Sequence, residues 1–168
     1  AAPPPFGFGL WTTHVTPTLL GIPTVLMPRF SADEALALIG RHRVTVLAAV
    51  STQFVMMLNS ARLQDTDFSS LRVMFTGGEM VPYERALAFE ERTGAAVLQF
   101  YGSNETGGFS RTGLADPQEK RLTTAGRPIA CMEVRLFDDA GNDITASGTG
   151  QPGGKGPLLS AGYFNDPE

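Results

Sequence analysis

Ten residues near the middle of the chain, QFYGSNETGG at 99–108, combine groups that can bind a nucleotide and a metal. Tyr101 offers an aromatic face on which a base can stack, and Asn104 can donate an N–H to an anionic oxygen. Glu105 is a hard oxygen ligand of the kind that divalent cations prefer. Glycine and asparagine after a strand also form ordinary turns, so local chemistry leaves both interpretations open.

A second stretch of this kind, TGGEMVP at 76–82, lies earlier in the chain, where Gly77 and Gly78 permit close approach of a flat ligand to the backbone. Each stretch follows an apolar run that predicts a strand, LRVMF at 71–75 and AAVLQF at 95–100. Ligands of open α/β sheets bind beyond the carboxyl ends of the strands, and consecutive strands are commonly neighbours. The sequence therefore predicts that both stretches border one crevice.

Strands and helices alternate around these two stretches. Two further strands are predicted upstream, over PTVLMPRF at 23–30 and VTVLAAV at 44–50. The predicted helices run from a capping box of Ser31 and Glu34 to about His42, from the caps Ser51 and Thr52 through QFVMMLN at 53–59, and from a first turn with Pro82 to just before Gly94. This alternation predicts an α/β fold with a mostly parallel sheet and helices on both of its faces.

The pattern changes after residue 108. The stretch MEVRLFDDAGNDI at 132–144 predicts an antiparallel hairpin with a glycine-containing turn. We therefore expect residues 1–124 to form a parallel α/β subdomain that is incomplete at its start. Residues 125–168 are expected to begin a smaller antiparallel β subdomain that is incomplete at its end.

Composition excludes several classes of partner. The chain carries 13 Lys and Arg against 17 Asp and Glu with no block of like charge, which argues against nucleic acid and anionic membranes as partners. No apolar run approaches the roughly 20 residues of a membrane span. A single cysteine, Cys131, and the lack of a secretion signal predict a cytoplasmic setting. Because only 18% of the residues are charged, against about 25% in an average soluble domain, we expect other protein to cover part of the surface.

Four blocks of the sequence, in the same order, resemble the adenylate-forming (AMP-binding) superfamily, which includes acyl-CoA and aryl-CoA ligases, luciferases and the adenylation domains of peptide synthetases. The blocks are PPPFGFGL at 3–10, FTGGEM at 75–80, YGSNE at 101–105 and GQPGGKGPLLSAGYFNDPE at 150–168. The resemblance covers nearly the whole chain. It implies that the chain is an internal fragment of the large N-terminal domain of such an enzyme.

The resemblance also implies roles for individual residues. Tyr101 would stack on the adenine, Asn104 would contact the α-phosphate in place of the usual threonine, and Glu105 would bind Mg²⁺. Asn104 and Glu105 are thus the predicted catalytic residues. The nucleotide would be bound by Gly77, Gly78, Glu79, Met80, Tyr101, Gly102, Ser103 and Asn104, and the acyl pocket would be lined by Gly7, Phe8, Gly77, Gly102, Gly108 and Phe109.

The implied reaction has two steps. A small-molecule carboxylate attacks the α-phosphate of ATP to give an acyl-adenylate and pyrophosphate, and a thiol, usually that of coenzyme A, then takes the acyl group. Amino-acid-activating members usually place an aspartate in the first block, and PPPFGFGLW has none. Glycines beside Phe8 and Phe109 favour an aromatic, alicyclic or medium acyl group. The same glycines are equally compatible with tight turns alone.

The sequence departs from the family pattern at several positions. Phe6 replaces the usual histidine, Gln151 replaces the usual glutamate, and PGG at 152–154 interrupts what is normally a strand. The lysine loop that holds the β- and γ-phosphates is expected upstream, and the ribose-binding aspartate and the C-terminal domain are expected downstream. The chain alone is therefore expected to be inactive. The alternatives are a degenerate, non-catalytic adenylate-binding fragment and an amino-acid adenylation domain.

Overall fold

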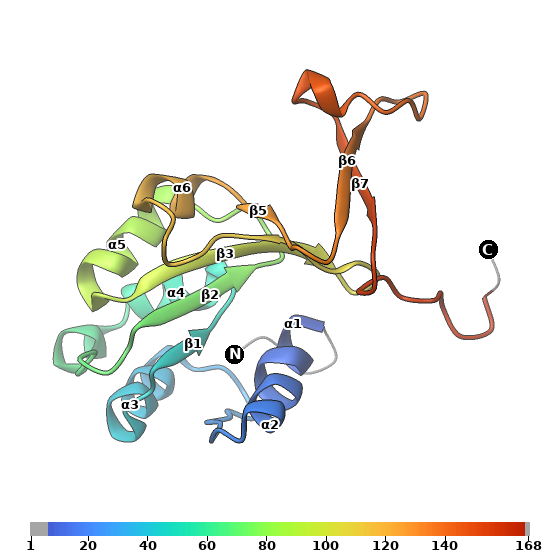
Figure 1. Cartoon of the computed structure of the whole chain (residues 1–168). Helices are drawn as coiled ribbons and strands as arrows, with labels where there is room; N and C mark the ends of the chain where they lie inside the picture. The colour runs from blue at the N-terminus through green and yellow to red at the C-terminus, as the bar shows by residue number, and fades with distance from the viewer. Residues whose placement is uncertain (1–6, 167–168) are drawn as a thin grey trace.

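The computed structural model describes residues 7–166 as a five-stranded sheet with helices packed against it and a two-stranded sheet that projects from one end (Figure 1). The strand order of the larger sheet follows the chain. Its strands are β1 (Val46–Ala48), β2 (Val73–Gly77), β3 (Ala96–Ser103), β4 (Gly107–Arg111) and β5 (Arg127–Pro128). β1, β2 and β3 are parallel, whereas β4 and β5 continue the sheet in antiparallel fashion.

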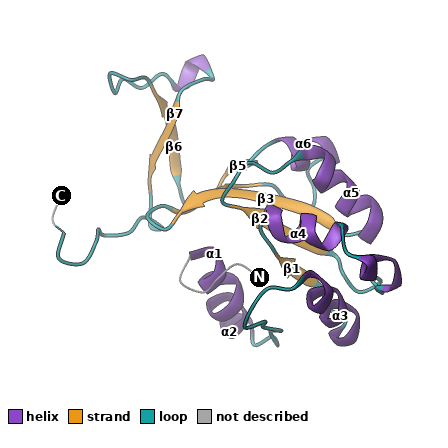
Figure 2. Ribbon diagram, turned by 180° about the vertical axis from the view of Figure 1, so that it is seen from behind, coloured by secondary structure: helices purple, strands orange, loops and turns teal. Residues whose placement is uncertain are grey.

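Four helices share the main core with the central strands. They are α3 (Ala32–His42), α4 (Ser51–Leu58), α5 (Tyr83–Thr93) and α6 (Gln118–Thr123), with the short 3₁₀ helix η2 (Ala61–Asp65) between α4 and β2. Met74 of β2 and Val97 of β3 are paired in register and point into this core, and both are fully buried. Figure 2 shows α4 lying against β2 and β3. Burial of these apolar side chains is the main term that holds the helices on the sheet.

The opposite face of the sheet carries the first helical segment. It consists of α1 (Gly7–Leu10), the π-helical η1 (Trp11–Val15) and α2 (Thr16–Leu20). Phe100 lies three residues after Val97 and therefore points to the other face of β3. Its ring packs against that of Phe8, with the centroids 4.8 Å apart. The predicted α/β class, with a parallel set of strands and helices on both faces, is confirmed, although most helices gather on one face.

Residues typical of helix ends lie at the termini of α3 and α5, close to where the sequence predicts them. The hydroxyl of Ser31 accepts a hydrogen bond from the Glu34 N–H at 3.4 Å, and α3 begins at the next residue. Pro82 is the N-cap of α5, and Gly94 ends this helix with a φ of 72°. A left-handed residue at this position is what a helix C-terminus commonly requires. No helix between residues 7 and 166 is long and apolar enough to cross a membrane.

Two sequence predictions upstream of β2 are wrong. Residues 23–30 form no strand, because Pro23 and Pro28 have no N–H to donate and the segment pairs with no described strand. Ser51 and Thr52 do not cap α4 but form its first turn. At this helix start the Gln53 side chain accepts from the Val50 N–H at 3.3 Å, and the carboxylate of Glu79, from outside the helix, accepts from the Ser51 N–H at 2.9 Å.

The predicted hairpin at 132–144 is also different in the structure. β6 (Glu133–Phe137) pairs antiparallel with β7 (Gln151–Lys155), so the main partner strand lies beyond the predicted stretch. The turn at Gly141 is present, but the returning chain makes only a single bridge between Phe137 and Asp143 before the short 3₁₀ helix η3 (Thr145–Ser147).

The PGG sequence at 152–154 belongs to β7 and does not interrupt it. A two-stranded sheet leaves one edge of each strand open, where proline is tolerated. Gly153 leaves room for the ring of Phe137, since a Cβ there would lie 2.8 Å from that ring. Because β5 still pairs with β4, the change from one sheet to the other falls between Pro128 and Glu133. The division into subdomains at residue 124 stays a prediction.

Candidate active site

The two glycine-containing stretches meet at one edge of the larger sheet. β2 and β3 are paired in parallel with Gly77 opposite Phe100, so the residues that follow each strand leave the sheet side by side. Residues 78–80 follow β2, and Tyr101 to Ser103 complete β3 before the turn into β4. The sheet therefore brings together the residues predicted to bind the nucleotide, which lie about 25 positions apart in the sequence.

Three of the glycines at this edge have a packing role within the chain. A Cβ on Gly77 would lie 2.8 Å from the ring of Phe100, and a Cβ on Gly102 would overlap the carbonyl oxygen of Gly107. A Cβ on Gly108 would lie 2.9 Å from the Cδ1 of Ile129. These contacts explain the glycines as sites of close backbone packing. A role for them in lining an acyl pocket stays a prediction. The ring of Phe100 lies beside Gly77, and the ring of Phe8 packs against that of Phe100.

Tyr101 is supported from one side and open on the other. Its ring meets that of Phe109 edge to face, with centroids 6.0 Å apart, and half of the tyrosine remains exposed. Phe109 itself is buried and also contacts the second sheet, where a Cβ on Gly154 would lie 2.9 Å from its ring. This arrangement leaves an aromatic face available for stacking. Met80, on the neighbouring loop, is 92% exposed.

The turn from β3 to β4 is held by reciprocal hydrogen bonds. The Ser103 hydroxyl accepts from the N–H groups of Glu105 and Thr106, and the Thr106 hydroxyl accepts from the Ser103 N–H. The Asn104 side chain is also oriented, because its Oδ1 accepts from the Gly7 N–H at 2.8 Å. This bond uses only the amide oxygen, so the NH₂ group keeps its capacity to donate to an anion.

Glu105 lies at the tip of this turn and is bonded to the end of the chain. Its carboxylate accepts from the Tyr163 hydroxyl, and its backbone carbonyl accepts from the Ser160 N–H at 2.7 Å. Hydrogen bonds from the hydroxyls of Tyr163 and Ser103 and from its own N–H lower the pKa of the Glu105 carboxyl. The group is therefore ionised at neutral pH, as a metal ligand must be.

The donor set at this turn fits one kind of metal site. Among residues 7–166, no three His, Cys, Asp or Glu side chains gather in a way that could hold an ion by themselves. Mg²⁺ is commonly bound by one or two carboxylates together with water and substrate phosphates. Glu105 beside Asn104 therefore fits a Mg²⁺ ion that arrives with a polyphosphate.

Sequence reasoning missed the side-chain partner of Glu79 and the partner of Glu105. The Glu79 carboxylate accepts a hydrogen bond at the start of α4. The predicted contact of Glu79 with the edge of the adenine therefore falls to its backbone. Tyr163 stands in the quoted block at 150–168, but nothing in its local sequence indicated a contact 58 residues away.

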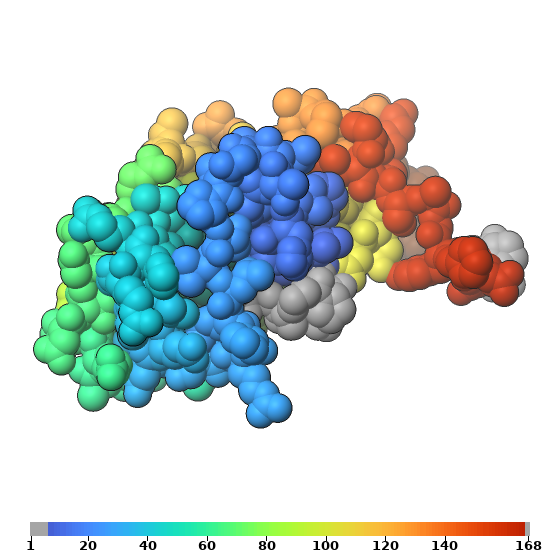
Figure 3. All heavy atoms as spheres, turned by 90° about the horizontal axis from the view of Figure 1, so that it is seen from below, coloured from blue at the N-terminus to red at the C-terminus, as the bar shows by residue number. Residues whose placement is uncertain are grey.

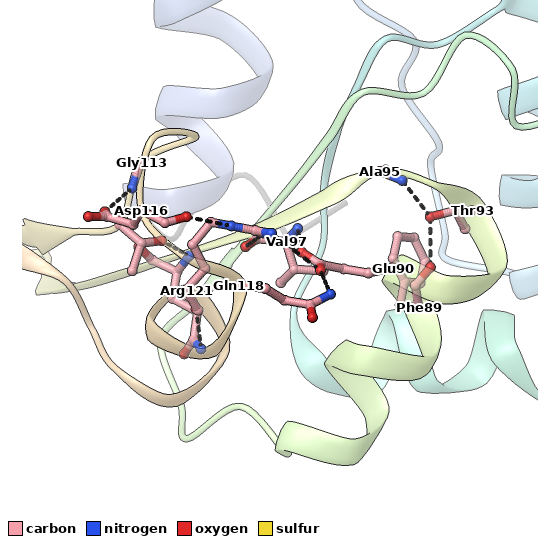
Figure 4. Close-up of polar contacts among 11 residues, drawn as sticks. Phe89, Glu90, Thr93, Ala95, Val97, Gly113, Asp116, Gln118 and Arg121 are labelled. Carbon is pink, nitrogen blue, oxygen red and sulfur yellow. Dashed lines mark hydrogen bonds and ion pairs between the residues drawn. The ribbon is translucent and has the colours of Figure 1, made fainter.

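A second polar cluster lies at the other end of β3 and is structural. Glu90 of α5 accepts from the Val97 N–H and from the Gln118 side chain, both at 2.6 Å, and forms a buried ion pair with Arg121 of α6 (Figure 4). Glu90 and Arg121 thus satisfy each other's charge within the fold. The candidate active site is the edge that holds Tyr101, Asn104 and Glu105.

Comparison with known proteins shows the family of the chain. Residues 1–164 match the family model described as AMP-binding enzyme, and the chain belongs to this family. It is 34% identical to indoleacetate–CoA ligase from Aromatoleum aromaticum over 97% of this chain and 32% of the relative. It is 31% identical to medium-chain fatty-acid–CoA ligase from Escherichia coli over 99% of this chain and 30% of the relative.

A solved structure shows the same fold. ATP-bound MatB from Rhodopseudomonas palustris is 26% identical and superposes with a TM-score of 0.87, covering 100% of this chain and 33% of MatB. The chain thus spans about a third of the length of the relatives it matches.

Proposed function

We propose that the protein activates a carboxylic acid with ATP to an acyl-adenylate and then transfers the acyl group to the thiol of coenzyme A. The observation that carries the proposal is the convergence of Tyr101, Asn104 and Glu105 at the carboxyl edge of β2 and β3, in a chain that belongs to the AMP-binding family. Coenzyme A is proposed as the acceptor because the indoleacetate and medium-chain fatty-acid relatives described above are named as CoA ligases.

Each residue has a defined part in the proposed adenylation. Tyr101, supported by Phe109, stacks on the adenine while the backbone at 78–80 lies along its edge. The Asn104 NH₂ group donates to the α-phosphate, and the ionised Glu105 holds Mg²⁺, which neutralises phosphate charge when bound. The chain supplies no covalent nucleophile, because the carboxylate of the substrate attacks directly and catalysis rests on positioning.

We propose an aromatic, alicyclic or medium-chain acid as substrate. The ring of Phe100 lies beside Gly77, and the ring of Phe8 packs against it, so that two apolar side chains lie next to the proposed nucleotide site. Two of the relatives are named for indoleacetate, an aromatic acid, and for medium-chain fatty acids, which supports the same range. An apolar surface of this kind favours such acids over charged ones.

The test is acid-dependent exchange of pyrophosphate into ATP by the full-length protein. A panel of aryl, alicyclic, medium-chain and amino acids should give Mg²⁺-dependent exchange with members of the first three groups. Glu105→Gln should lower that exchange on the order of 100-fold, because the metal loses its carboxylate ligand. Glu119→Gln, an exposed acid on α6, is the matched control and should leave the rate unchanged.

Exchange with amino acids alone would contradict the proposed substrate class. If the folded protein shows no pyrophosphate exchange with any acid of the panel, the proposed function as a whole is contradicted.

A further inference from the structure

Residues 158–160 pass the β3–β4 turn after β7 has ended, and the chain then extends away from the larger sheet (Figure 1). Three contacts join this part of the chain to the turn. Leu158 packs against Gly107, where a Cβ would lie 3.1 Å from the Leu158 Cβ. The Ser160 N–H and the Tyr163 hydroxyl both donate to Glu105, the first to its backbone carbonyl and the second to its carboxylate.

Core burial does not explain where Tyr163 lies, because the residue is 67% exposed. Its backbone carbonyl is occupied by a turn with Asp166, which fixes the main chain but not the phenol. The hydroxyl has one described hydrogen-bond partner, the carboxylate of Glu105. A hydroxyl that donates to an ionised carboxylate makes a charge-assisted bond, which is stronger than a neutral one.

The carboxylate of an exposed glutamate otherwise samples many rotamers, and this freedom is lost when it binds a metal. A hydrogen bond that already holds one carboxylate oxygen removes part of that loss before the metal arrives. Partners that orient metal ligands act in this way, and their removal commonly weakens metal binding 10- to 100-fold.

We propose that Tyr163 is a positioning residue that holds the Glu105 carboxylate in the orientation in which it binds the metal of a metal–nucleotide complex. The proposal rests on the proposed function, in which Glu105 is the metal ligand. It predicts that metal affinity depends on a tyrosine 58 residues away from the ligand.

The experiment measures Mn²⁺ binding to the full-length protein in the presence of ATP by electron paramagnetic resonance, with Mn²⁺ as a probe for Mg²⁺. Tyr163→Phe removes the hydroxyl and keeps the ring, and we expect it to weaken Mn²⁺ affinity roughly tenfold. Tyr83→Phe, an exposed tyrosine at the start of α5, is the matched control and should bind Mn²⁺ as the wild type does. Glu105→Gln gives the affinity with the carboxylate removed.

Thermal unfolding separates positioning from a simple anchoring role. Positioning predicts weaker Mn²⁺ binding in Tyr163→Phe with an unchanged melting temperature. If Glu105→Gln weakens Mn²⁺ binding while the Tyr163→Phe variant binds Mn²⁺ as tightly as the wild type or more tightly, this inference is wrong and the proposed function stands. If neither substitution changes Mn²⁺ binding, the assignment of Glu105 as metal ligand fails and the inference fails with it.

Discussion

At the scale of single residues, the Glu79 side chain makes a structural hydrogen bond that its position in a glycine-rich loop does not predict. Its carboxylate accepts from the Ser51 N–H at 2.9 Å, at the first turn of α4. The first N–H groups of a helix have no partner within the helix, and a negative charge near them is favoured by the helix dipole. Glu79 thereby connects the predicted adenine loop to the start of a core helix.

We expect Glu79→Ala to destabilise the chain by about 1 kcal/mol, the usual value for the loss of a capping acceptor. Glu79→Gln keeps an oxygen acceptor and should lose less. Urea unfolding followed by circular dichroism measures both changes. Equal stabilities for Glu79→Ala and the wild type would show that water replaces this acceptor without cost.

At the scale of elements, one buried ion pair joins α5 and α6 to the start of β3. Arg121 bonds Glu90 and also donates to the Val97 carbonyl at 3.1 Å. Removal of one partner from a buried pair leaves the other charge unpaired and commonly costs 3–5 kcal/mol. We therefore expect Arg121→Met to lower the free energy of unfolding by about 3 kcal/mol at pH 7, measured by urea titration.

The same pair predicts a pH dependence. Burial alone raises the pKa of Glu90, but hydrogen bonds from Arg121, Gln118 and the Val97 N–H outweigh it, so the pKa lies below its ordinary value of 4.5. Because the folded pKa is lowered, this stabilisation is present above pH 4.5 and is lost as the pH falls through the folded pKa. The difference between wild type and Arg121→Met should thus shrink in acid. A difference that stays constant from pH 7 to pH 3 would contradict this account.

At the scale of the whole molecule, the first helical segment and the chain after it expose several large apolar side chains. Figure 3 shows this segment, in blue, spread across the face of the molecule seen from below. Leu19 is 79% exposed and Leu20 is 64% exposed, and Ile22 and Leu26 follow with about half of their surface accessible. Large exposed apolar side chains that gather in one segment favour an interface over a free protein surface.

We expect the 168-residue chain to self-associate through this face. The double substitution Leu19→Ser and Leu20→Ser should shift it toward the monomer in analytical ultracentrifugation, because both side chains are far from the core. Leu114→Ser is the matched control, since Leu114 is 66% exposed outside this segment. Unchanged association in the double variant, or an equal shift in the control, would locate the contact elsewhere.

The amino-acid sequence by itself determined those features whose causes lie within a few residues. The Ser31 cap, Pro82 and Gly94 set the ends of α3 and α5, and apolar runs marked β2 and β3. These signals are local, because caps and periodicity act over one or two turns. The meeting of the two loops followed from strand order, which parallel crossovers restrict.

The tertiary structure alone decided which distant groups became partners. The Glu79 carboxylate accepts from the Ser51 N–H at the start of α4, and the Tyr163 hydroxyl donates to the Glu105 carboxylate. β6 pairs with β7 across a 13-residue connection. The stretch at 23–30 had the composition of a strand, but it pairs with no strand among residues 7–166. The physical reason is the same in each case: a hydrogen bond needs a partner group in place, and only the folded chain determines which group arrives there.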